Sequence, residues 1–312
     1  MLDKVNRILL GVALFALTAA ALLRLYAYDQ LAVAPIDQSS VTTLTGPGAT
    51  IFDTGQLAEI QVDLTTTAKT VGLVRETEKE GNDVRVWETT TSTRSDDGVV
   101  RSRSVERIAF DAYTGEAVNC CGAFDETVTG DRVEVERKGQ LVKFPFQTKK
   151  KTYTWWDSSL SQGVPIKFVK EEDVKGLGTY KFEQTIEPTV LSKAQVPASV
   201  LGEEGSGNLE AEMTYSNVRT LWVEPRTGVV IKRAEQQFNT IRYNGEDRVT
   251  TTKVTTGFDD KTVQENVDTY GSLSTMLFLL RTLVPALLVV LAILLGAIIV
   301  LRSRRRPSDT AS

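Results

Sequence analysis

The sequence predicts a mainly β protein of the α+β class, with an antiparallel β-rich domain between two transmembrane helices. Two uncharged apolar runs lie near the ends of the 312-residue chain, and charged residues and threonine fill the region between them. That central region alternates apolar and polar residues over many short segments, which is typical of strands with one buried face.

The first apolar run, residues 8–23, follows Lys4 and Arg7. A helix of this length covers roughly 24 Å, short of the roughly 30 Å hydrocarbon core of a bilayer. Arg24 can snorkel to the interface and let the span continue to Tyr28. We therefore predict a cytoplasmic N-terminus over 1–7 and an uncleaved signal-anchor helix over 8–28.

A cleaved signal peptide is the alternative for this run, because a basic start and a short apolar stretch ending in alanines fit that description too. Apolar character continues past Ala19–Ala21, and the second candidate site, Ala32–Ala34, is followed by Pro35. Both features favour the anchor.

The second run, residues 282–301, is uncharged and long enough for about 30 Å of helix. Pro285 lies in the first turn of this uncharged run, where a missing backbone donor matters least, which favours a helix-start residue over a functional kink. Arginines follow at 302 and 304–306. We predict a transmembrane helix over 275–301 and a cytoplasmic basic tail over 302–312.

Basic residues at both ends place both termini in the cytoplasm and the region 29–274 outside the cell membrane. This region holds 38 of the 40 acidic and 28 of the 36 basic residues, so its net charge is −10 against −4 for the whole chain. An acidic exterior domain is not a nucleic-acid binder.

Alternating segments and turn residues predict the strands of the exterior domain. The expected strands cover 83–93, 99–111, 132–137, 141–146, 166–170, 179–186, 209–215, 219–224, 228–234, 238–243 and 248–256. Helices are expected at the ends of the chain alone, where Asp259 and Asp260 can cap a helix that leads into the second span.

Residues 108–119 and 221–232 are weakly similar to each other. In each segment a strand ends in a Thr-Gly turn and another strand follows. The domain could therefore hold two similar β-modules. A Thr-Gly turn that arose twice explains the similarity as well, because such turns are common.

The chain has no histidine, which excludes Ser-His-Asp and Cys-His catalysis and imidazole metal sites. Neighbouring carboxylates, such as Glu171 to Asp173, are the expected solvated surface of an acidic domain. We predict no enzyme activity, no catalytic residues, no metal site and no cofactor.

Cys120 and Cys121 are adjacent and are the two cysteines of the chain. In an oxidising exterior compartment they can close a vicinal disulfide. Such a ring would clip a local turn, and a redox or ligand-contact role is the alternative.

An aromatic segment with a neighbouring lysine run contains the candidate ligand-binding residues Phe144, Phe146, Tyr153, Trp155 and Trp156. Such residues could stack a sugar or hold an acyl chain. Core packing is the alternative, because large aromatics in β proteins mostly fill cores. Adjacent residues of a strand face opposite sides, so one of the two tryptophans is expected outside the main core.

Several short motifs occur in a characteristic order: Phe144–Phe146, then Tyr153, Trp156 and Asp157, then residues 222–228 (WVEPRTG), flanked by the two spans. In this order they resemble the actinobacterial PorA-type porin family. The resemblance implies an envelope protein of a mycolic-acid bacterium and a channel-forming function.

The residues themselves favour a binding or transport function. A membrane β-barrel needs an apolar outer face, whereas strands such as 83–93 carry Thr, Arg and Glu on the face away from the core. We expect membrane lipid as a partner, with envelope proteins or a second copy of the chain as others. The leading hypothesis is an anchored domain that binds or transports envelope lipid or another hydrophobic ligand; a porin and a non-catalytic scaffold are the alternatives.

Overall fold

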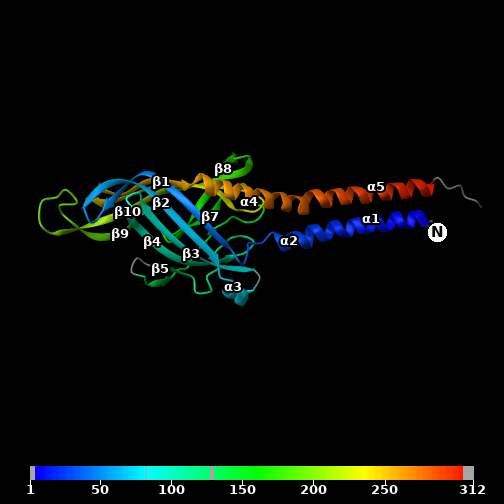
Figure 1. Ribbon diagram of the computed structural model, residues 1–312, viewed down its shortest axis with the longest axis horizontal. Coiled ribbons are helices and arrows are strands. Elements are labelled where there is room, and N and C mark those ends of the chain that lie inside the picture. Colours follow the sequence, from blue (N-terminus) through cyan, green and yellow to red (C-terminus); the bar gives the residue numbers. More distant parts are fainter. Residues whose placement is uncertain (1–3, 82, 127–129, 305–312) are drawn as a thin grey trace, which may run out of the picture. The chain divides into compact units, whose positions relative to one another are not determined.

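The computed structural model describes residues 4–81, 83–126 and 130–304, and the chain forms two compact units. One unit consists of Met1–Val33 together with Ser272–Ser312, and the other is Ala34–Gly271. The first unit is helical and the second is built around a β-sheet (Figure 1).

The helical unit is an antiparallel pair of helices. Its first helix consists of α1 (Lys4–Leu22), a π-helical turn η1 (Leu23–Ala27) and α2 (Tyr28–Leu31), and its second consists of the end of α4 (Asp260–Phe278), a π-helical turn η2 (Leu279–Leu283) and α5 (Val284–Arg304). Ala13 and Ala16 pack against Ala292, because small side chains let two helices approach closely. Both helices are long and apolar enough to cross a membrane.

Pro285 is the second residue of α5, in its first turn as predicted, but α5 continues α4 and η2 in one helix from Asp260 to Arg304. An α-helix would bond the carbonyl of Arg281 to the backbone nitrogen of residue 285, and proline has no N–H to donate. The π-helical turn η2 comes directly before this position. The missing donor is therefore accommodated by a local change of helical turn.

The β unit contains twelve antiparallel strands in a single sheet, as the fold class predicts. The strand order is β6-β5-β4-β3-β2-β1-β12-β11-β10-β9-β8-β7. The strands are β1 (Ser39–Asp53), β2 (Ala58–Gly72), β3 (Val84–Ser95), β4 (Val100–Asp111), β5 (Phe124–Glu126), β6 (Arg132–Glu134), β7 (Tyr153–Asp157), β8 (Gln162–Val174), β9 (Leu177–Pro197), β10 (Asn208–Val223), β11 (Val230–Tyr243) and β12 (Glu246–Phe258). A short helix, α3 (Val74–Glu80), joins β2 to β3.

The sheet is not closed, and its end strands are β6 and β7. Isolated bridges nevertheless lead from β4 towards β7, through Phe110 with Ala117, Glu116 with Gln140, and Gln140 with Trp155. In the described part of the chain, the outer edges of β4 at 100–105 and of β9 at 187–197 pair with no strand. The two ends of the strand order are thus linked along one stretch and free along another.

Apolar side chains pack on both faces of the sheet. One core cluster contains Phe144, Tyr153, Trp155, Ile166, Phe182, Leu221 and Val223. On α4, Val263 is buried in a second cluster with Trp222 and Ile231. The beginning of α4 therefore covers part of the sheet (Figure 1).

Two Thr-Gly turns have the same hydrogen-bond pattern. In the first, Asp111 Oδ1 accepts bonds from the backbone N and the hydroxyl of Thr114, and Gly115 N donates to Asp111 O. In the second, Glu224 Oε2 accepts the same two bonds from Thr227, and Gly228 N donates to Glu224 O. Whether the turns mark two related β-modules stays a prediction.

The predicted strand over 141–146 is wrong, because the backbone N–H groups of this segment donate to the two Thr-Gly turns. Leu141 N donates to Gly115 O, and Phe144 N donates to Gly228 O at 2.7 Å. Pro145 also lacks a donor for a ladder. The segment therefore joins the turns instead of extending the sheet.

Other differences concern the extent of the strands. The pairs predicted at 209–215 with 219–224 and at 228–234 with 238–243 are each one continuous strand, β10 and β11. β1 and β2 were not predicted. Within β1, Pro47 and Gly48 form a bulge opposite Asp63, whose Oδ1 accepts from Gly48 N at 2.7 Å. α3 is a helix away from the ends of the chain, where none was expected.

Candidate functional site

A hollow of about 410 Å³ lies against the curled sheet. Its lining comes from both ends of the strand order: β1 to β5 on one side and β7, β10 and β11 on the other. A second hollow of about 570 Å³, lined by β1 to β4, β11 and β12, shares Thr66 with the first. We call the first the seam hollow, because the two ends of the open sheet meet around it.

The lining of the seam hollow mixes apolar and charged side chains. Its apolar members include Leu44, Ala68, Val105, Ile108, Leu141, Val142, Trp155 and Trp156, and its charged members are Glu106, Asp125, Glu126, Arg137, Arg219 and Arg233. A site with this lining suits an amphiphilic molecule better than a purely apolar one.

One side of the seam hollow is a buried ionic network on β7, β10 and β11. Arg219 lies 3.1 Å from the Asp157 carboxylate and 2.6 Å from that of Glu235. The hydroxyl of Tyr215 donates to Asp157 Oδ2 at 3.0 Å, and Arg233 Nε donates to Glu235 Oε1 at 2.6 Å. Two arginines thus face two carboxylates, so the network is neutral.

This environment shifts the pKa values of its members. Burial alone would raise the pKa of Glu235, but the guanidinium groups of Arg233 and Arg219 lower it to about 2. Burial and the neighbouring Asp157 charge raise the pKa of Tyr215 to about 12. Glu235 therefore stays ionised and Tyr215 stays a neutral donor at neutral pH.

The other side of the hollow is organised by Arg137, which is buried and pairs with Asp125 and with Glu106. The side chain of Asn119 holds the backbone of Arg137, accepting from its N at 2.8 Å and donating to its O at 3.1 Å. Burial and the nearby Asp125 charge raise the pKa of Glu106, although Arg137 opposes this. Water still reaches 41% of the Glu106 side chain, because it lines the hollow.

Two buried donors that line the hollow carry no partner in the described part of the chain. These are the indole Nε1 of Trp156 and the Nε of Arg137. A buried N–H without an acceptor is costly, and a bound molecule with oxygen acceptors would remove that cost.

The predicted ligand residues divide into two groups. Phe144, Tyr153 and Trp155 belong to the core cluster, where Phe144 stacks on Trp155 with ring centroids 5.1 Å apart. Trp156 lies outside that cluster and lines the seam hollow, and Trp155 reaches the hollow from its core position. The ring of Phe146 lies 4.1 Å from the Lys143 amine, away from the hollow's lining. A ligand-binding role for these residues stays a prediction.

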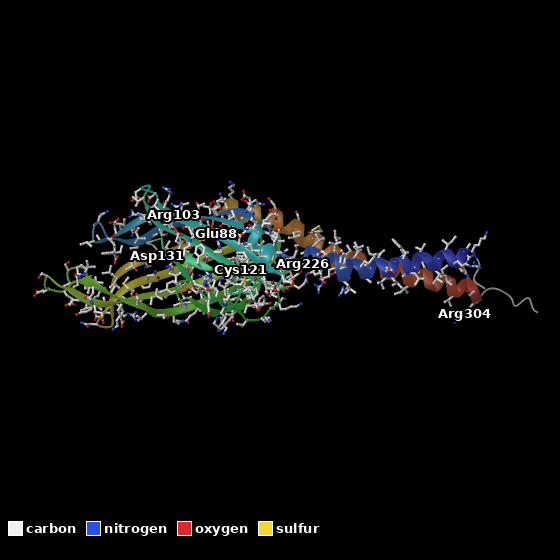
Figure 2. The ribbon with its side chains drawn as sticks, turned by 90° about the horizontal axis from the view of Figure 1, so that it is seen from below. Glu88, Arg103, Cys121, Asp131, Arg226 and Arg304 are labelled. Carbon is white, nitrogen blue, oxygen red and sulfur yellow. A yellow bond between two sulfur atoms is a disulfide. The ribbon has the colours of Figure 1, made fainter. Side chains whose placement is uncertain are left out.

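Cys120 and Cys121 are joined in a vicinal disulfide. Cys121 lies in the β unit (Figure 2), on the segment between β4 and β5. Asn119, which holds Arg137, comes directly before this pair. The disulfide therefore closes a local turn beside the Arg137 side of the hollow.

The charged lining was missed by the sequence analysis, although one signal was present. Arg219 alternates with Tyr215, Leu221 and Val223 on one face of β10, and that face is buried. A charge at an inward position of a strand indicates a buried ionic network. Arg137 alternates with Val133 and Val135 in the predicted strand 132–137, but β6 ends at Glu134 and its residues are exposed, so this pattern did not mark a buried face.

A helix pair apolar enough to cross a membrane, together with a curled antiparallel sheet, defines a membrane-associated β protein. The family described as Porin PorA matches residues 5–301, so the chain belongs to the Porin PorA family. This confirms the family that the motifs suggested.

Two curated relatives are similar to part of the chain, and both are described as "Porin PorA". The protein of Corynebacterium amycolatum is 31% identical over 127 residues, covering 33% of each chain. That of Corynebacterium resistens is 30% identical over 146 residues, covering 32% of this chain and 35% of the relative. The similarity thus spans about a third of each relative's length.

Proposed function

We propose that this chain is a two-span envelope protein that binds an amphiphilic envelope lipid on its β domain. The observation that carries the proposal is the mixed lining of the seam hollow, where the Trp156 Nε1 and the Arg137 Nε are buried donors without a partner among the described residues. Aliphatic and indole surface would cover part of an acyl chain, while the donors would bind ester or head-group oxygens. The domain would hold its ligand without transforming it.

Native mass spectrometry of the full chain, released gently from the membrane, tests this proposal. We expect a co-purifying lipid that is lost in a Ser104→Trp variant, because Ser104 lines the hollow and an indole there would fill it. Ser206→Trp, at an exposed loop position, is the matched control and should keep the lipid. Lipid-free wild-type protein, or equal lipid in both variants, would contradict the proposal.

The name of the relatives favours a second candidate function, a channel. Since the sheet is open and two helices cannot enclose a pore, a channel would need several copies of the chain. Acidic β domains around the pore would make it cation-selective. Planar-bilayer recordings test this candidate, and conductance no higher than that of a mock preparation would end it.

For the orientation we propose that both termini are cytoplasmic and that the β domain is extracytoplasmic. The basic residues Lys4 and Arg7 at one end of the chain, and Arg302 and Arg304 at the other, support this orientation.

A further inference from the structure

Two arginines lie side by side in the helical unit, each within a π-helical turn. Arg24 belongs to η1 and Arg281 to η2, and the Nη1 of Arg24 donates to the carbonyl oxygen of Arg281 at 2.9 Å. Single π-helical turns inside α-helices are rare and occur frequently at functional sites. Here both helices carry one, and the two turns meet.

Pro285 removes the α-helical donor for the acceptor of this bond. The Arg281 carbonyl is the group that an α-helix would bond to the backbone N–H of residue 285, and proline has none. Arg24 supplies the missing donor from the other helix. Its guanidinium is thereby fixed through a single N–H, which leaves donors for another acceptor.

Arg281 is held as well, since its guanidinium lies over the buried ring of Tyr28 at 4.7 Å from the ring centroid. In the described part of the helical unit, Asp29 is the one acidic residue, and no ion pair joins it to either arginine. In this part of the helical unit, two guanidinium groups are therefore held near each other, and no carboxylate pairs with them.

The place of these arginines fits a lipid head group. Uncharged runs of 8–23 and 282–301 separate them from the basic residues at the opposite end of the helix pair, a distance of about 24 to 30 Å of helix. That is close to the thickness of a hydrocarbon core, so both guanidinium groups would lie at the level of the head groups. Arginine pairs bind phosphate with several charge-assisted hydrogen bonds.

We propose that Arg24 and Arg281 form a binding site for the phosphate of an anionic phospholipid. Arg24 and Arg281 donate to the phosphate oxygens, while the Arg281 carbonyl and the Tyr28 ring hold the two side chains in position. This site is separate from the seam hollow and does not depend on the function proposed for it.

Titration of the purified full chain with phosphatidylglycerol, followed by native mass spectrometry, tests the site. We expect Arg24→Gln and Arg281→Gln to weaken binding about tenfold each, equivalent to about 1.4 kcal/mol. Arg304→Gln, which removes the same charge at the far end of α5 (Figure 2), is the matched control and should leave the affinity within about twofold.

A second variant, Pro285→Ala, keeps both charges. The substitution restores a backbone N–H at position 285. This N–H competes with the Arg24 guanidinium for the Arg281 carbonyl. We expect weaker binding of phosphatidylglycerol together with an unchanged or more stable helix, which excludes misfolding as the cause.

Two further measurements distinguish an anionic lipid from other molecules that carry a phosphate. Phosphatidylcholine, which is zwitterionic, should bind much more weakly than phosphatidylglycerol. Displacement of the lipid by millimolar inorganic phosphate would overturn the lipid assignment, and so would equal binding of the two lipids. Equal retention of phosphatidylglycerol by the wild type, both glutamine variants and Pro285→Ala would overturn the site itself.

Discussion

Lys143 is a buried amine held by the chain's own backbone. Its Nζ donates to Phe144 O at 2.6 Å and to Tyr113 O at 3.2 Å, between the two Thr-Gly turns. Burial lowers the pKa of Lys143 from 10.5 to about 7, and the charge of Asp111 offsets a small part of this. The folded protein therefore binds this proton far more weakly than the unfolded chain does.

The sign of the pH dependence follows from these two pKa values. Between about pH 7 and 10.5 the unfolded chain binds more protons at this residue, so the free energy of unfolding rises with pH. From pH 7 to 9 we expect wild type to gain about 1 to 3 kcal/mol relative to Lys143→Met. Urea denaturation of the full chain, followed by tryptophan fluorescence, measures this difference.

Lys149→Met is the control for this experiment, because Lys149 is exposed. Its stability should keep a constant difference from wild type over the same pH range. Parallel curves for wild type and Lys143→Met would contradict the lowered pKa.

Loss of Arg219 should destabilise the fold strongly. Its replacement by methionine would leave the carboxylates of Asp157 and Glu235 buried with fewer partners. Breaking a buried ion pair from one side costs about 3 to 5 kcal/mol. We expect Arg219→Met to lose that much in urea denaturation.

Lys193→Met removes a basic residue from an exposed ion pair and serves as the control. Lys193 pairs with Glu210 at 2.8 Å, and both side chains are 58% exposed. Exposed pairs contribute less than about 1 kcal/mol. An Arg219→Met variant as stable as Lys193→Met would show that the network does not stabilise the fold.

Among the elements, the second Thr-Gly turn is the most constrained. Gly228 has φ +74°, and a Cβ added there would lie 2.0 Å from Phe144 O, a backbone atom of the segment that joins the two turns. Gly176 has a similar φ of +85° with nothing within 4 Å of an added Cβ. The two glycines separate the cost of the left-handed backbone from the cost of the clash.

We therefore expect Gly176→Ala to lose about 1 to 2 kcal/mol, the cost of a left-handed alanine. Gly228→Ala should lose clearly more, because the 141–146 segment must also move away from the turn. Thermal unfolding of the two variants, measured side by side, gives the comparison. Equal losses would mean that the segment adapts freely.

The free edge of β9 bears on the scaffold hypothesis. Residues 187–193 are exposed, and Val190 and Leu191 keep more than a third of their surface accessible. The same stretch contains Pro188, Lys193 and a register shift at Leu191 against β10. These are features that proteins use to prevent strand addition, so this edge is a poor docking site for another strand.

Strands were predicted correctly where apolar and polar residues alternate regularly. The prediction failed where backbone hydrogen bonds join segments far apart in the sequence. β3, β4 and β12 follow their apolar-polar patterns closely. Residues 141–146 show a similar pattern, yet their hydrogen-bond partners are turns that lie far along the chain, at Gly115 and Gly228. No local pattern reports such partners, which is also why the seam hollow could not be predicted.

The whole molecule combines cationic ends with an acidic centre. Residues 29–274 carry a net charge of −10, while the rest of the chain carries +6. The antiparallel helices put Lys4 and Arg304 at the same end of the helix pair, so the basic residues of both termini reinforce each other. The sequence predicted both apolar segments, because membrane spans depend on composition and length, which are local properties.

Cysteine labelling tests the orientation that this charge pattern favours. In the described part of the chain no cysteine is free, so a single new cysteine is the one reactive thiol. A membrane-impermeant maleimide should label Ser206→Cys in intact cells, because position 206 is exposed in the β unit. Ser303→Cys, beside the basic end of α5, should react after permeabilisation and not before. Labelling of Ser303→Cys in intact cells, with Ser206→Cys protected, would invert the topology and place the acidic domain in the cytoplasm, against the positive-inside rule.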